Sequence, residues 1–139
     1  MTTQVNSIGR DVSAIMDRLK YRVWDNYAKK YVDGFCLALS PNGRLRVEHY
    51  SGALHSISVI DNRYVVERST GLRDKNNNLI YEHDLVKDQF GAIYQVIWQD
   101  DFASFYLMLQ SGHPEFIARI FEDEILEIIG NIHNKEQKQ

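Results

Sequence analysis

The spacing of the hydrophobic positions changes about twenty residues into the chain. In residues 6–20, apolar side chains recur at intervals of three and four, which places them on one face of a helix. The members of this stripe are Ile8, Val12, Ile15, Met16 and Leu19. Asn6 or Ser7 is suited to cap the helix, whereas Gly9 weakens its first turn. We therefore expect an amphipathic helix within residues 1–19.

From Tyr21 the apolar period becomes two, which is typical of strands. The first segments are YRVWD, YVDGFCLALS, RLRVEHY, ALHSISVI and RYVVERS, separated by the turn sequences PNG, SG and DN. This pattern predicts an antiparallel β-meander over residues 20–69. If Ser51 and Gly52 form a two-residue hairpin loop, Glu48 faces His55 and Arg46 faces Ile57.

A second set of strands follows: DLVKD, AIYQVIWQ, SFYLMLQ and ILEIIGNI. Val86 begins one inward face, and Tyr94, Val96 and Trp98 form another alternating set, with Ile93 and Ile97 pointing the opposite way. Both faces are therefore apolar. Short strands that are apolar on both sides favour a small closed barrel, because closure removes exposed strand edges. We place this barrel at residues 70–134 and expect residues 135–139 to form a loose tail.

Length and composition indicate a single folded domain. The chain has 139 residues, of which 44% are hydrophobic and 25% charged. No apolar run is long enough to cross a bilayer, and the first residues lack the pattern of a signal peptide. Cys36 is the only cysteine and lies in the apolar run GFCLAL, so we expect a buried thiol in the reducing cytosol.

The net charge of −3 and the pI near 5.9 argue against non-specific binding of nucleic acid. Local basic residues form a patch only if the fold gathers them. The candidates for such a nucleic-acid patch are Lys29, Lys30, Arg44 and Arg46.

Three ordered motifs carry a resemblance to a known family. TGLRDKNNNLIYEHDLV at residues 70–86 is followed by YQVIW and then by EIIGNI, and KYRVWDNYAKKYV at residues 20–32 looks like a family opening. Together they resemble the YopX family of phage and prophage proteins, from Lys20 to Asn134. The resemblance implies a phage-encoded, mainly β protein with an SH3-like barrel in its C-terminal half, no assigned enzymatic activity and no catalytic residues.

The chain departs from the family pattern at two positions. Asn77 and His83 stand where the family commonly has glycine. Asn tolerates a left-handed backbone, so Asn77 in place of glycine costs little free energy. For His83, either a positive φ is not required or strain of about 1 kcal/mol is accepted.

Glu82, His83 and Asp84 contain groups that can bind a metal, but neighbouring side chains on a strand point to opposite faces. The other histidines lack the short paired spacing of a zinc site. They are His49, His55, His113 and His133. We expect no catalytic residue, metal or cofactor, and we expect Asp84 to cap the turn with its carboxylate.

Aromatic residues crowd the C-terminal half, and any that remain exposed would mark a protein interface. Trp98 and Phe102, which flank the turn at Gln99–Asp101, are the first candidates for partner binding. The acidic residues Glu122, Asp123 and Glu124 would offer a negative face to a basic partner or imitate a nucleic acid; a solvated acidic segment is the alternative.

These observations favour a non-enzymatic phage protein that binds a host protein or nucleoprotein complex, with inhibition of host defence or regulation as one mode of action. A nucleic-acid-binding barrel is the alternative. We expect no membrane association. The helix stripe predicts self-association, most simply as a symmetric dimer, unless the helix packs on its own barrel.

Overall fold

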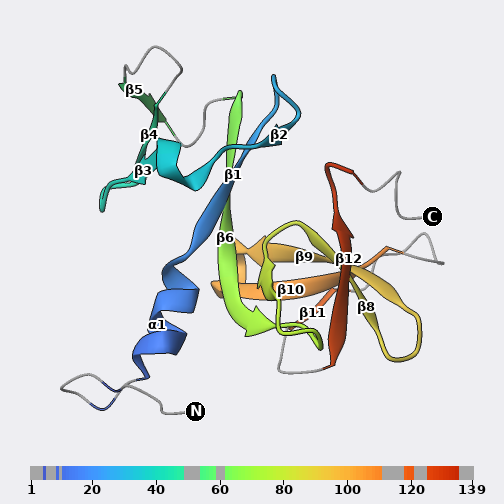
Figure 1. Cartoon of the computed structure of the whole chain (residues 1–139). Coiled ribbons are helices and arrows are strands. Elements are labelled where there is room, and N and C mark those ends of the chain that lie inside the picture. Colours follow the sequence, from blue (N-terminus) through green and yellow to red (C-terminus); the bar gives the residue numbers. More distant parts are fainter. Residues whose placement is uncertain are drawn as a thin grey trace. The chain divides into compact units, whose positions relative to one another are not determined.

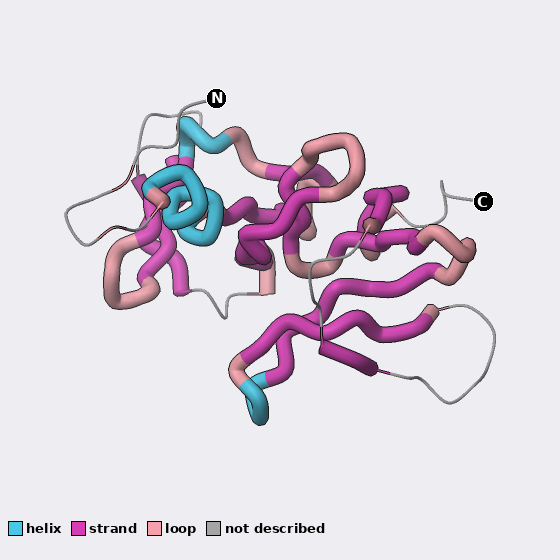
Figure 2. The backbone as a smooth tube through the Cα atoms, turned by 90° about the horizontal axis from the view of Figure 1, so that it is seen from below, coloured by secondary structure: helices cyan, strands magenta, loops and turns pink. Residues whose placement is uncertain are grey.

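A computed structural model describes residues 5, 9, 11–48, 54–58, 62–110, 118–120 and 125–134. Strands make up most of the described backbone, as Figure 2 shows. The helical elements are α1 (Val12–Leu19), η1 (Gly34–Cys36) and η2 (Asp100–Phe102). The strands are β1 (Tyr21–Asp25), β2 (Lys30–Tyr31), β3 (Leu37–Leu39), β4 (Arg44–Glu48), β5 (Leu54–Ser58), β6 (Tyr64–Arg73), β7 (Leu79–Tyr81), β8 (Asp84–Asp88), β9 (Ile93–Gln99), β10 (Ser104–Leu109), β11 (Ala118–Ile120) and β12 (Leu126–Asn131). The expectation of a mainly β protein is confirmed.

The chain divides into two compact units. The large unit combines Met1–Lys20 with Arg68–Gln139, and the small unit is Tyr21–Glu67. The division falls within β6, whose residues up to Glu67 belong to the small unit and whose later residues belong to the large unit.

The large unit is built on a curled five-stranded antiparallel sheet with the strand order β11-β10-β9-β8-β12 (Figure 1). Its core follows from the period of two, because Val86, Val96 and Leu107 are fully buried on their strands. Ile80 of β7 and Leu126 of β12 complete this apolar cluster. The predicted inward positions Val86 and Val96 are therefore confirmed.

The small unit contains a second apolar cluster. Val23 of β1, Leu45 and Val47 of β4 and Tyr64 of β6 are buried together. In strand order β1 lies between β2 and β6, while β3, β4 and β5 form a three-stranded antiparallel sheet. Alternation along β4 buries Leu45 and Val47 and leaves Arg44 and Arg46, which point to the other side, exposed.

Two details of the predicted meander are wrong. The register pairs Glu48 with Leu54 and Arg46 with Ser56, not with His55 and Ile57. Ser51 and Gly52, the assumed hairpin loop, lie outside the described residues.

The predicted strand YVDGFCLALS is also interrupted. The chain forms the 3-10 turn η1 between β2 and β3, in which the Cys36 N–H donates to the Asp33 carbonyl at 2.8 Å. Cys36 is half-buried rather than buried. The turn breaks the alternation on which the strand prediction rested.

The helix begins later than its pattern suggests. Asp11 caps α1, because its carboxylate accepts hydrogen bonds from the N–H groups of Ser13 at 3.0 Å and Ala14 at 3.4 Å. Gly9 has φ +80°, which is outside the helical region and prevents one helix from running through residues 6–20. Asn6 and Ser7, the expected caps, lie outside the described residues. Of the helices described, none has the length and apolar character needed to span a bilayer.

Candidate functional site

The turn between β6 and β7 is organised by one carboxylate. Asp74 Oδ1 accepts hydrogen bonds from the N–H groups of Asn76 and Asn78, both at 2.9 Å, and Oδ2 accepts from the Ile128 N–H at 3.1 Å. Burial by itself would raise the pKa of Asp74, but these N–H groups outweigh it and lower the pKa. Asn77 has φ +68°, as its place in the turn requires. The motif therefore serves to hold the turn against β12.

The segment Glu82-His83-Asp84 has a structural arrangement that differs in part from the prediction. Glu82 and His83 form a turn between β7 and β8, so the expectation that they alternate along a strand is wrong. The Asp84 carboxylate, 2% exposed, accepts a hydrogen bond from the Tyr81 N–H at 2.8 Å, which confirms its expected role as a turn cap.

His83 adopts the left-handed backbone that glycine would favour. Its φ is +73°, and two backbone hydrogen bonds fix it: its N–H donates to the Val96 carbonyl at 2.8 Å, and its carbonyl accepts from the Ile132 N–H at 3.1 Å. The turn thus requires a positive φ, and this chain accepts the strain of placing histidine there.

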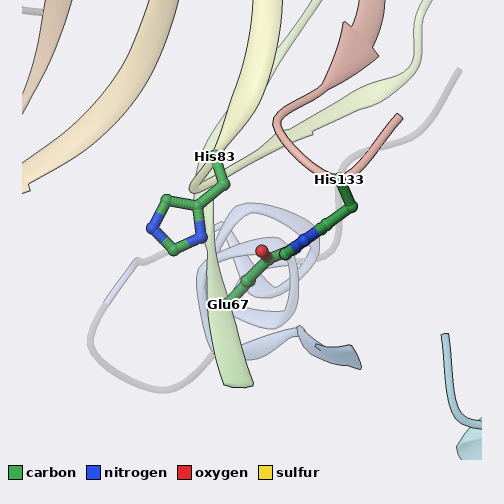
Figure 3. A group of neighbouring side chains, drawn as sticks. All are labelled: Glu67, His83 and His133. Atoms are coloured by element: carbon green, nitrogen blue, oxygen red, sulfur yellow. The ribbon is translucent and has the colours of Figure 1, made fainter. Parts of the chain in front are cut away.

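His83 and His133 are the two histidines of the large unit that approach each other. Their ring centroids lie 6.4 Å apart with an interplanar angle of 90°, and Figure 3 shows His83 and His133 in adjacent turns. As metal ligands the pair would supply two nitrogens, whereas structural zinc takes four ligands.

Glu67, also labelled in Figure 3, is the last residue of the small unit. Its side chain is fully buried and accepts hydrogen bonds from Arg22 Nε at 2.7 Å and from the Tyr31 hydroxyl at 2.9 Å. The Arg22 guanidinium also lies over the Tyr31 ring, 4.7 Å from its centroid. Within this unit Glu67 is part of a buried ion pair.

The turn between β9 and β10 carries exposed aromatic surface. Phe102 and Tyr106 form what we term the turn aromatic surface. Phe102 is 66% exposed, and its ring lies 5.8 Å from that of Tyr106. Ala103 has φ +48°, which closes η2 and lets β10 begin at the next residue.

Trp98, by contrast, is held by several contacts. Its Nε1–H donates to Asp100 Oδ1 at 2.8 Å, its ring meets Phe105 edge-on at 5.0 Å, and the Arg68 guanidinium lies 4.3 Å from its centroid. Trp98 is therefore fixed and half-buried beside Phe105, on the sheet face opposite to Tyr106. Phe102 is the exposed member of the predicted pair.

The structure describes the predicted basic residues but not the predicted acidic ones. Glu122, Asp123 and Glu124 lie outside the described residues. Arg44 and Arg46 are exposed on the same side of β4, opposite its buried positions, and Lys29 and Lys30 are exposed in and beside β2.

Helix α1 is attached to the large unit through polar groups. The Asp17 carboxylate accepts hydrogen bonds from the Arg73 guanidinium at 3.0 to 3.2 Å, and the Lys20 carbonyl accepts from the Ser69 N–H at 3.0 Å. None of the helix residues is buried.

The predicted apolar stripe of α1 is only partly covered. Met16 is 57% exposed and Leu19 73% exposed, while Val12 and Ile15 are half-buried. Ile8 lies outside the described residues.

The sequence patterns did not predict a pocket of about 320 Å³ in the large unit, beside the turn after β8 and the start of β12. The residues that line it include Gly91 in the turn after β8 and Ile125 before β12. They escaped notice because the two walls of the pocket lie more than thirty residues apart in the chain.

Comparisons with known proteins agree with the motifs. The family model described as YopX protein matches residues 20–137. A crystal structure of protein yopX from Bacillus subtilis has a TM-score of 0.53 and 17% sequence identity, covering 86% of this chain and 96% of that one. Protein EF1440 from Enterococcus faecalis has a TM-score of 0.45 and 20% identity, over 86% and 97% of the chains. No curated protein matches.

Proposed function

The chain belongs to the YopX family, and on that premise we propose that it acts by binding rather than by catalysis. In this proposal it is a phage-encoded protein of the host cytosol that engages a host protein or nucleoprotein complex. Its mode of action is inhibition of a host defence or regulatory machine.

The observation that carries the proposal is the turn aromatic surface. Phe102 leaves 66% of its area in solvent and lies beside Tyr106, although burial would be favourable for both rings. Aromatic residues held on a rigid support are enriched where proteins meet, because they bury a large area at low entropic cost. The β9–β10 ladder, in which Tyr106 pairs with Ile97, provides that support.

The proposal of a non-enzymatic role is supported by how the carboxylates are used. Asp74 and Asp84 accept hydrogen bonds from backbone amides, and Glu67 pairs with Arg22. A general base or nucleophile needs an ionisable group directed at substrate, and these groups are occupied in holding turns and strands.

The test compares two exposed aromatic side chains. Affinity-tagged chain and the variants Phe102→Ser and Tyr27→Ser are used to capture proteins from host lysate, with mass spectrometry as the readout. Tyr27 is the matched control, since it is 73% exposed and belongs to the small unit. We expect one host protein or complex to be enriched by the wild type and by Tyr27→Ser, and to be lost with Phe102→Ser. Equal capture by all three, or none above background, would contradict the proposal.

Nucleic-acid binding is the second candidate, favoured by one observation: Arg44 and Arg46 are both exposed on one side of β4. Replacing both by Gln should then abolish a salt-dependent shift of DNA or RNA. Lys29 and Lys30 would extend the patch. No shift by the wild type at low salt would exclude this candidate.

We also propose that α1 mediates association, as a symmetric dimer, because Met16 and Leu19 leave an apolar face in solvent. The double variant Met16→Ser, Leu19→Ser should lower the mass measured by light scattering and keep the thermal stability of the wild type. Deletion of residues 1–19 is a second test. An unchanged mass for both variants would contradict the proposal.

The finer fold proposal is that the curled sheet of the large unit belongs to the SH3-like barrel class. Its support is the antiparallel order β11-β10-β9-β8-β12 around one apolar cluster. An experimental structure in which β11 and β12 do not approach closure would contradict it.

A further inference from the structure

The pocket of the large unit is formed by two segments that converge from distant parts of the chain. The turn Gln89–Gly91 contributes one wall, and residues 125–127 at the start of β12 contribute another. Lys75 adds a third side and is fixed there by its N–H, which donates to the Leu126 carbonyl at 2.8 Å. The volume of about 320 Å³ is at the lower end of the range for small-ligand sites.

The pocket has an apolar side. Leu126 lines it from the fully buried core, and Ile125, which also lines it, is 63% exposed. Gly91 has φ +90°, and a Cβ atom built there would meet nothing within 4 Å, so the wall is open at this point. A ligand that fills the pocket would cover Ile125 and gain the free energy of apolar burial.

The charges lining the pocket are two lysines and two carboxylates, but three of the four are already engaged. Asp88 Oδ1 accepts from the N–H groups of Phe90 at 2.9 Å and Ala92 at 3.0 Å, and its Oδ2 accepts from the Tyr94 hydroxyl at 3.3 Å. These bonds stabilise the Asp88 charge inside its own turn.

Glu127 is engaged as well, because it pairs with Lys75 at 3.5 Å. Lys87 lies opposite Glu127 in the β8–β12 register, yet among the described residues it has no carboxylate within salt-bridge distance. Of the charged groups that the structure describes at the pocket, the ammonium of Lys87 is the one available to a ligand.

We propose that this pocket binds an apolar carboxylate, with its carboxylate on Lys87 and its aliphatic group against Ile125. The same chemistry is offered by a small free acid and by the C-terminal residue of a peptide. The site is separate from the turn aromatic surface, because Phe90 and Phe102 lie at opposite ends of β9, a strand of seven residues spanning about 20 Å.

The test uses the full chain, labelled with ¹⁵N, in a titration followed by amide chemical shifts. The probes are N-acetyl-leucine, its neutral methylamide, and the peptide acetyl-Ala-Ala-Leu with a free carboxyl end. We expect N-acetyl-leucine to shift the amides of Gly91, Leu126 and Glu127 saturably, and the methylamide to bind at least about fivefold more weakly, since it lacks the charge that pairs with Lys87.

Two substitutions of Lys87 test its role in binding, and a substitution of Lys30 is the control. Lys87→Gln should weaken the binding of N-acetyl-leucine by about fivefold, whereas Lys87→Arg should retain it. Lys30→Gln makes the same charge change at a residue that does not line the pocket and should bind like the wild type. Tighter binding of the peptide than of N-acetyl-leucine would identify a peptide end as the source, and weaker binding a free acid. Absence of saturable shifts, equal binding of the methylamide, or unchanged binding by Lys87→Gln would each overturn the proposal.

Discussion

The two units stabilise their buried carboxylates in different ways. In the large unit, Asp74 and Asp84 receive backbone N–H groups, most of them within four residues in the chain. In the small unit, Asp25 accepts two hydrogen bonds from Arg63 at 3.1 Å, across 38 residues, and Glu67 accepts one from Arg22 across 45 residues. The large unit therefore relies mainly on local capping. The small unit adds ion pairs that form only when the strands have assembled, although Asp25 also accepts the nearby N–H groups of Tyr27 and Ala28.

The difference has an energetic consequence. A carboxylate that accepts backbone N–H groups gains partners without burying a second charge. A buried ion pair requires the desolvation of both groups, so its net contribution is small, but removing one partner leaves an uncompensated charge. We therefore expect substitutions at the arginines of the small unit to cost more than substitutions in the turns of the large unit.

The two tryptophans allow this comparison to be measured in one chain. Trp24 lies in β1 of the small unit and Trp98 in β9 of the large unit. The variants Trp98→Phe and Trp24→Phe leave a single fluorescent reporter in the small and large unit, respectively. Urea unfolding followed in each background then assigns a loss of stability to its unit.

The largest effect is expected for Arg22→Ala. Glu67 is fully buried, and loss of its arginine should cost about 3 kcal/mol of unfolding free energy. The loss should be seen first by Trp24. In the double variant Arg22→Ala, Glu67→Gln the charge is removed together with its partner, so part of the stability should return. If the double variant is no more stable than Arg22→Ala, the buried charge is not the cause.

A smaller effect is expected for Asp74→Ala, which removes the acceptor of three backbone N–H groups. We expect a loss of about 2 kcal/mol reported by Trp98, and a smaller loss for Asp74→Asn, which keeps one side-chain oxygen. A larger loss than that of Arg22→Ala would reverse the comparison between the units.

Asp74 should also make the unfolding free energy depend on pH. The pKa of Asp74 is lowered in the folded chain from the ordinary value of 3.8, so its contribution is complete above that value and is lost as the pH falls below it. Burial also acts to raise the pKa of Asp25, but hydrogen bonds from Arg63 and from the N–H groups of Tyr27 and Ala28 lower it. Acid unfolding of Asp74→Asn, followed by Trp98 fluorescence, should depend less steeply on pH below 3.8 than that of the wild type. Identical slopes would show that Asp74 does not titrate with unfolding.

The smallest effect is expected for His83→Gly. Glycine removes the strain at φ +73° but also the ring contact with His133 and adds freedom to the unfolded chain, so stability should change by no more than about 1 kcal/mol. Target binding should be unchanged. Stoichiometric zinc that survives dialysis of the wild type and is lost in this variant, measured by elemental analysis, would show that the histidine has a metal role.

Several features of the fold follow from short stretches of sequence. The period of two gave strands β1 and β8 with their observed bounds, and it identified Val86 and Val96 as core residues. The Asp74 turn and the Asp84 cap were also predictable, because their bonds join groups that are close in the chain. The family was recognisable from three motifs in the same way, and its model matches residues 20–137.

From the sequence, candidate site residues could be predicted by their chemical type, but not by their exposure or their contacts. The exposure of Phe102 and the support of Trp98 by Arg68 depend on how β6 and β9 lie in the large unit, thirty residues apart. The pocket was missed because Lys87 and Ile125 approach each other through the β8–β12 pairing, whose partners are about forty residues apart.

The sequence by itself determined strands such as β1 and β8, the Asp84 cap and the family, since each of these rests on the periodicity of a segment, on bonds within a few residues, or on ordered motifs. The tertiary structure alone decided the pairing of Arg22 with Glu67, the register of β4 with β5, and the half-covered stripe of α1. The physical reason is that burial and ion pairing act between whichever groups the chain brings together, and a local pattern does not specify which distant groups those are.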